Sequence, residues 1–228
     1  FDLIYARPGQ SEHAWEAELS RALGFGTGHL SLYQLTIEPG TRFATLVRDG
    51  TLTPLDDDAA ADLFALTRAM TTASGLPAYE TSNHARAGEE SRHNLTYWRY
   101  QDYAGIGPGA HGRRQGMATV RHRKPENFLR AVAERGHGIA EERALPLREQ
   151  AMEALLMGLR LTEGIRPPAL AERFGMAESD LIDPRGRERL ATMGFLNDTE
   201  QHLSVTERGA PLLEALLADL VPDTLVAP

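Results

Sequence analysis

The spacing of apolar and polar residues predicts a strand–helix–strand unit at the start of the chain. Residues 1–6 read as a strand that runs into a turn, and residues 30–37 read as a stronger strand that a Pro-Gly pair ends. Between them, Ser11 can cap a helix, and the apolar stripe of that helix consists of Trp15, Leu19, Ala22 and Leu23. Because parallel strands need a crossover connection, this order predicts a parallel sheet.

Two further helices and a short strand are predicted in the next hundred residues. Three aspartates at positions 56–58 favour a helix start because negative charge stabilises the positive end of the helix dipole. Gly75 ends that helix, whose buried face is predicted to hold Leu63, Leu66 and Met70. Residues 78–82 form a short strand candidate. Pro125 begins another helix, which places three apolar side chains on one face: Phe128, Leu129 and Val132.

From residue 147 onward the pattern is helical. Successive helices are predicted at 147–159, around Leu170 and Phe174, at 184–193 and at 212–220, with a hairpin formed by 195–196 and 203–206 before the last helix. We therefore expect an α/β fold with two domains. An α/β domain occupies residues 1–140, and a small helical, winged-helix-like domain occupies residues 147–228.

Composition narrows the classes of function. The 228 residues carry a formal net charge of −8, which does not attract nucleic acid or an anionic membrane. With no cysteine the chain can form neither a disulfide nor a thiolate metal site. No signal peptide and no membrane-spanning run are evident, so a cytoplasmic location is expected. Although the net charge is negative, basic residues cluster at 111–114 and 121–124. This cluster is interpreted either as a solvated loop or as a clamp for carboxylates or phosphates.

The most distinctive chemistry lies at residues 93–98, where an imidazole, an amide and two large aromatic rings occur close together: His93, Asn94, Tyr97 and Trp98. Neutral imidazole is a good iron ligand, and aromatic rings offer broad apolar faces, so this combination suits a flat, metal-carrying ligand such as haem. The alternative is a strand end with a buried histidine and two core aromatics, because these residue types are commonly found partly buried.

Other polar clusters allow weaker interpretations. Asp2 is either a structural partner for a buried backbone group or a ligand contact. Residues 38–41 lie at the carboxyl end of a strand, where parallel sheets bind ligands, although a plain β-turn explains them equally well.

His84 and His93 with nearby glutamates match none of the tight metal-ligand spacings, so no protein-only metal site is expected. The glycine run at 105–112 is not a dinucleotide fingerprint because Pro108 interrupts it and no amphipathic helix follows.

Read as ordered motifs, the chain resembles the HemW-type haem chaperones of the radical S-adenosylmethionine superfamily, which are relatives of oxygen-independent coproporphyrinogen oxidases. The motifs span nearly the whole chain, and the sequence departs from the usual family pattern at Ala6-Arg7, where Gly-Leu is common. The matching segments are residues 2–5 with 8–10, 30–41, 79–83, 93–98, 105–111 and 157–165.

The resemblance implies a fold, a function and roles for single residues. It implies the later strands of a partial (β/α) barrel followed by the winged-helix-like domain. It implies a chaperone that binds haem and delivers it to a haem-requiring protein, with an oxygen-independent coproporphyrinogen III oxidase-like enzyme as the alternative. His93 would contact haem, supported by Asn94, Tyr97 and Trp98. S-adenosylmethionine would be contacted at three positions: Asp2, Thr36 and His111.

The resemblance also points to an absence. Such proteins carry a Cys-x-x-x-Cys-x-x-Cys loop that holds a [4Fe–4S] cluster, and this chain has no cysteine. We therefore expect the sequence to be the C-terminal part of a longer protein, without the cluster and without radical chemistry of its own.

Overall fold

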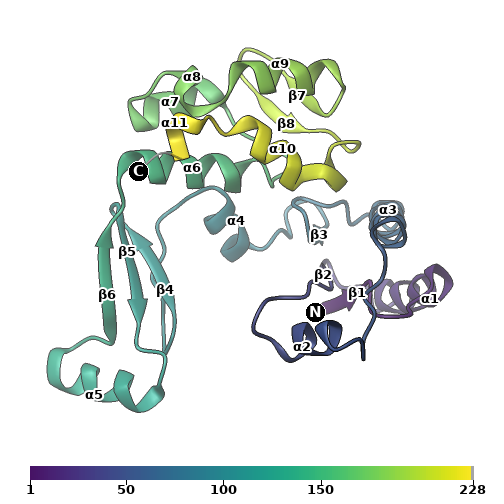
Figure 1. The fold of residues 1–228 in the computed structure, drawn as a ribbon, viewed down its shortest axis with the longest axis horizontal. Helices are drawn as coiled ribbons and strands as arrows, with labels where there is room; N and C mark the ends of the chain where they lie inside the picture. The colour runs from purple at the N-terminus through teal and green to yellow at the C-terminus, as the bar shows by residue number, and fades with distance from the viewer. Residues whose placement is uncertain (227–228) are drawn as a thin grey trace. The chain divides into compact units, whose positions relative to one another are not determined.

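The computed structural model describes residues 1–226, and the chain forms two compact units, Phe1–Ser91 and Arg92–Pro228. Figure 1 shows the order of the elements in each unit. The fold is mixed α/β, as predicted. The compact units meet in the chain at residue 91, which differs from the expected domain limits of 1–140 and 147–228. Those limits stay a prediction, and residues 227–228 lie outside the described residues.

The predicted strand–helix–strand unit is confirmed in the first unit. Strands β1 (Asp2–Tyr5) and β2 (His29–Gln34) pair in parallel, and helix α1 (Glu12–Leu23) connects them. The helix begins as expected, because the Ser11 side chain accepts a hydrogen bond from the backbone N–H of Ala14 at 3.2 Å. Ala6, directly after β1, has φ +55°. This left-handed conformation favours glycine, the residue that the resemblance leads us to expect at this position.

The third strand of this sheet differs from the prediction. Strand β3 (Asn83–Ala85) pairs antiparallel with β2, giving the order β1-β2-β3. The strand predicted at 78–82 is wrong, since only Ala78 of that segment makes a bridge, to His84. The chain reverses between these two residues, and the backbone N–H of Tyr79 donates to the carbonyl of Asn83 at 3.1 Å. A turn therefore lies where the sequence pattern predicted a strand.

Two helices lie between β2 and β3. Helix α3 (Asp57–Ala73) begins where the three aspartates predicted a helix start, and the carboxylate of Asp56 caps it by accepting from the Ala59 N–H at 2.8 Å. Helix α2 (Arg42–Arg48) was not predicted, although Thr41 caps it. The core of this unit is one apolar cluster beside the parallel strands, consisting of Tyr5, Ala6, Trp15, Leu19, Leu30, Leu32, Ala60, Leu63 and Leu76.

The second unit begins with helix α4 (Arg92–Trp98) and an antiparallel sheet of order β4-β5-β6. Its strands are β4 (His111–Arg114), β5 (Met117–Arg121) and β6 (Ile139–Ala144). Helix α5 (Pro125–Arg135) begins at the predicted proline and ends at Gly136, and Leu129 on it is 66% exposed. The interpretation of 111–114 and 121–124 as a solvated loop is wrong for 111–114, which pair with β5, and for Arg121, which pairs with β6, whereas residues 122–124 lie outside the strands.

The rest of this unit confirms the predicted helices and hairpin. Its elements are α6 (Leu147–Gly158), α7 (Pro167–Phe174), α8 (Glu178–Leu181), α9 (Pro184–Thr192), β7 (Leu196–Asp198), β8 (Leu203–Val205), the 3₁₀ turn η1 (Ala210–Leu212), α10 (Leu213–Leu220) and α11 (Asp223–Val226). Strands β7 and β8 pair antiparallel. Leucines from most of these elements share one core with Phe174 and Tyr100. Among residues 1–226, no helix has the length and apolar character needed to cross a membrane.

Candidate functional site

All four residues predicted to contact haem lie on helix α4. This helix has seven residues, and none of them is buried. His93 is exposed, whereas Asn94, Tyr97 and Trp98 are half-buried. The alternative interpretation, a strand end with a buried histidine and two core aromatics, is therefore wrong. The hexad forms a short helix that presents its imidazole to solvent.

The helix brings two of these rings together. His93 and Tyr97 are four positions apart, so they lie on the same side of an α-helix. Their ring centroids are 4.7 Å apart at an interplanar angle of 88°. Tyr103, which follows the helix in sequence, continues the contact, with its centroid 4.4 Å from that of Tyr97 and the rings at 73°. His93, Tyr97 and Tyr103 thus form an aromatic row, and sequence reasoning missed Tyr103 because it lies outside the hexad.

A buried arginine supports the far end of the aromatic row. The guanidinium carbon of Arg113, on β4, lies 5.4 Å from the Tyr103 ring centroid and 3.5 Å from that of Tyr100. Arg113 also donates to the Gln101 carbonyl at 3.1 Å. Burial raises the pKa of Tyr103, so its phenol stays protonated at neutral pH. The row is therefore held in place by a cation without carrying a negative charge of its own.

Trp98 has different surroundings from the aromatic row. It lines a cleft together with Arg99 and Tyr100, and the guanidinium of Arg160 lies 5.9 Å from its ring centroid. Within residues 1–226 it makes no ring–ring contact with His93 or Tyr97. The structure thus brings His93 and Tyr97 together and places Trp98 in separate surroundings.

The three residues predicted to contact S-adenosylmethionine are distributed over both units. Asp2 is exposed at the start of β1, so it is not the buried structural partner that the alternative required. Thr36 lies just beyond β2, and its hydroxyl donates to the Glu38 carboxylate at 3.1 Å. Because β1 and β2 are parallel with Asp2 opposite Ser31, Asp2 and Thr36 stand at opposite ends of this strand pair. His111 is exposed on β4, in the second unit.

A buried polar pair lies on the Asp2 face of the first sheet. The strand register aligns Asp2, Ser31 and Asn83 across the three strands, so their side chains share one face. The Asn83 amide donates to the carboxylate of Glu80, which is 1% exposed. Burial raises the pKa of Glu80, and hydrogen bonds from Asn83 and nearby backbone groups oppose that rise. Sequence reasoning gave this pair no role.

Neither a metal site nor a cluster site fits the residues described. No group of three His, Asp or Glu side chains in residues 1–226 is placed to hold a metal ion. His84 lies in the core, where its Nδ1 is 2.9 Å from the Thr71 hydroxyl. A [4Fe–4S] cluster needs thiolate ligands, and this chain contains no cysteine. No chemical step of this chain is therefore derived through such a cluster.

Comparison with known proteins agrees with these motifs. The HemN C-terminal domain family matches residues 145–212. The heme chaperone HemW of Bacillus subtilis is 33% identical over 91% of this chain and 55% of its own length. HemW of Escherichia coli is 34% identical over 95% of this chain and 56% of its own length. A mouse protein, radical S-adenosyl methionine domain-containing protein 1, mitochondrial, is 35% identical over 97% of this chain and 52% of its length.

A solved structure supports the fold. A solved structure of coproporphyrinogen III oxidase (HemN) from Escherichia coli, a radical SAM enzyme, matches with a TM-score of 0.74. The match covers 96% of this chain and 53% of the other, at 19% identity, and so concerns the fold alone. The chain spans about half the length of the curated relatives it matches. On its motifs, its relatives and its fold, the chain belongs to the HemW-type family of radical S-adenosylmethionine proteins.

Proposed function

We propose that this chain supplies the haem-contacting part of a haem chaperone, a protein that binds haem and delivers it to a haem-requiring partner. In this proposal the His93 imidazole contacts the iron, and the rest of the aromatic row lies beside the porphyrin. Asn94 and Trp98 support the helix that presents this imidazole. Two relatives with about one-third identity are named heme chaperones, which supports the proposal.

The observation that carries this proposal is the exposed imidazole of His93, braced edge-on against Tyr97. A ligand nitrogen must be reachable by a large planar molecule, and an exposed ring on a helix meets that condition. A ring fixed by a neighbour also loses less conformational freedom when it binds. Arg92, the residue before it, is exposed and offers a cation for a propionate.

A haem titration of the wild-type protein and three variants tests the proposal. Wild-type protein should shift the Soret band of added hemin, and His93→Ala should lose that shift. Tyr97→Ala should weaken binding less, because it removes the brace and leaves the ligand. His13→Ala is the matched control, since the His13 side chain is 94% exposed and lies on a different helix. Equal hemin binding by wild type and His93→Ala would remove His93 from this role.

The remaining family-level features belong to the same proposal. Residues 1–140 would be the later strands of a partial (β/α) barrel, which the parallel β1–α1–β2 unit supports. Residues 147–228 would be a winged-helix-like domain, which the helices followed by the β7–β8 hairpin support. We also propose that the protein is cytoplasmic, and that it delivers haem without binding nucleic acid or inserting into a membrane.

The S-adenosylmethionine contacts at Asp2, Thr36 and His111 are proposed for the full-length family protein, where cluster cysteines would be required. The alternative function, an oxygen-independent coproporphyrinogen III oxidase-like enzyme, has the solved structural neighbour in its favour. An oxidase of this kind would require the same cluster cysteines as S-adenosylmethionine binding. Oxidase activity of a full-length relative, assayed with coproporphyrinogen III, separates the two functions.

A further inference from the structure

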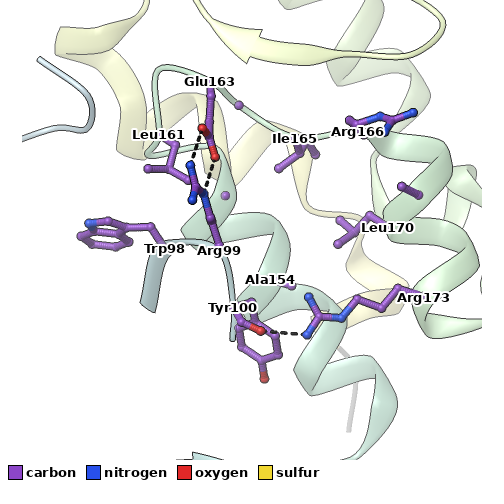
Figure 2. A pocket seen from close by; sticks show the side chains of 13 residues that line it. Trp98, Arg99, Tyr100, Ala154, Leu161, Glu163, Ile165, Arg166, Leu170 and Arg173 are labelled. Carbon is purple, nitrogen blue, oxygen red and sulfur yellow. Dashed lines mark hydrogen bonds and ion pairs between the residues drawn. The ribbon is translucent and has the colours of Figure 1, made fainter. Parts of the chain in front are cut away.

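Trp98, Arg99 and Tyr100 form one wall of a cleft that the proposed function does not use. Helices α6 and α7 and the loop between them form the other walls, and the cleft has a volume of about 220 Å³ (Figure 2). Every lining residue belongs to the second unit. The cleft is therefore a property of this unit alone.

The lining of the cleft is mostly apolar. Small residues of α6, α7 and their connecting loop leave the space open, and branched aliphatic side chains line it. The residues concerned are Ala154, Gly158, Leu161, Gly164, Ile165, Ala169 and Leu170. Such a surface favours a compact apolar group, because apolar area is removed from water when the cleft is filled.

Arg173 adds a positive charge that no acidic side chain neutralises. Figure 2 shows its guanidinium directed across the cleft to the carbonyl of Tyr100, to which it donates at 2.8 Å. That acceptor is neutral, and no carboxylate in residues 1–226 forms an ion pair with Arg173. Arg99 differs, because it forms a two-point ion pair with Glu163 at 2.8 and 2.9 Å. The uncompensated charge of the cleft is thus that of Arg173, with the exposed Arg166 at the rim.

The size of the cleft limits the ligand. Pockets for drug-sized ligands typically have volumes of roughly 300–1,000 Å³, so a cleft of about 220 Å³ is too small for a tetrapyrrole. We infer that the cleft binds a compact aliphatic carboxylate: a branched apolar group fills the lining, and its carboxylate pairs with Arg173. This site goes beyond the proposed haem contact and does not depend on it. A free branched-chain acid and the end of a peptide would share this chemistry.

Tryptophan fluorescence offers a direct test. The chain has two tryptophans, and Trp15 is fully buried in the first unit, so changes on binding report Trp98. N-acetylleucine and 4-methylpentanoate should each change the emission in a saturable way, whereas N-acetylleucinamide, which lacks the charge, should not. Tighter binding of N-acetylleucine would identify a peptide end as the source, and tighter binding of 4-methylpentanoate a free acid.

Two variants make the test specific. Arg173→Gln should raise the dissociation constant at least tenfold, and Ala169→Leu, which fills the cleft from an exposed position, should abolish the response. Arg185→Gln is the matched control, because Arg185 is exposed in the same unit and does not line the cleft. If Arg173→Gln does not fold, the fluorescence response of Ala169→Leu still tests whether the ligand binds in the cleft. An equal response to acid and amide, or unchanged binding by Ala169→Leu, would overturn the inference.

Discussion

Acidification should destabilise the first unit through a single buried histidine, His84. Its side chain is 1% exposed, and its Nδ1 lies 2.9 Å from the Thr71 hydroxyl, which also donates to the Thr67 carbonyl at 2.9 Å. Burial, with the nearby positive charge of Arg68, lowers the pKa of His84 from 6.5 to about 4. The folded state therefore keeps this imidazole neutral over a pH range in which the unfolded chain takes up a proton.

The sign and size of the effect follow from this shift in pKa. Between pH 6.5 and pH 4 the unfolded state binds more protons at this position, so the free energy of unfolding falls as the pH falls. Well above pH 6.5 the imidazole of His84 is neutral in both the folded and the unfolded state, so the free energy of unfolding no longer depends on pH through this residue. With ~1.4 kcal/mol per pKa unit, about 3 kcal/mol is lost by pH 4, and little more is lost below it. The raised pKa of Glu80 acts in the opposite direction, which makes a comparison of variants necessary.

Denaturant unfolding from pH 7 to pH 4 measures this contribution. In a Trp98→Phe background, Trp15 alone reports the first unit. The free energy of unfolding of the parent should fall by about 3 kcal/mol more over this range than that of His84→Gln. His13→Gln should follow the parent, because His13 is exposed. Parallel curves for the parent and His84→Gln would refute the reasoning.

Three further substitutions test packing, with thermal unfolding as the measurement. Gly164→Ala should cost about 3 kcal/mol or more, because φ is +61° and a Cβ would lie 2.2 Å from the Leu203 carbonyl oxygen. Gly175→Ala, at φ +62° with open space, should cost only ~1 kcal/mol, and equal losses would contradict this assignment. Thr67→Val should cost ~1–3 kcal/mol, because it leaves the Trp15 indole N–H, now bonded at 2.8 Å, unpaired in the core. An unchanged melting temperature would show that this N–H finds another acceptor.

Local signals predicted the elements that have a clear cap or period. Ser11 caps the helix that it was expected to cap, the aspartates at 56–58 mark the start of α3 as expected, and Gly175 follows the end of α7. The parallel pairing of β1 with β2 followed from the helix between them. The capping interactions lie within a few residues of their signals in sequence, so short-range patterns can detect them. The strand pairing joins distant residues and was predicted from the helical crossover between the two strands.

Elements that depend on long-range partners were missed. The β4 strand contains Gly112 and Arg113, neither of which is typical of a strand, and Arg113 is buried because Tyr100 and Tyr103 enclose it. The hexad gave the residue types of the candidate site but not its helical form, since a helix of seven residues is too short to show a clear helical period in the sequence. The separation of Trp98 from the aromatic row follows from the rotation of about 100° per residue along a helix.

The brevity of α4 has a consequence for any molecule that it holds. A helix of seven residues is marginal by itself in water, and no residue of α4 is buried. Its fixed point is Tyr100, just after its last turn, which is 3% exposed and donates its hydroxyl to Glu153 at 2.6 Å. The helix can therefore fray from its first turn while the core beneath stays intact. A cargo bound at His93 would sit on the end that unwinds first, so its departure need not disturb the rest of the unit.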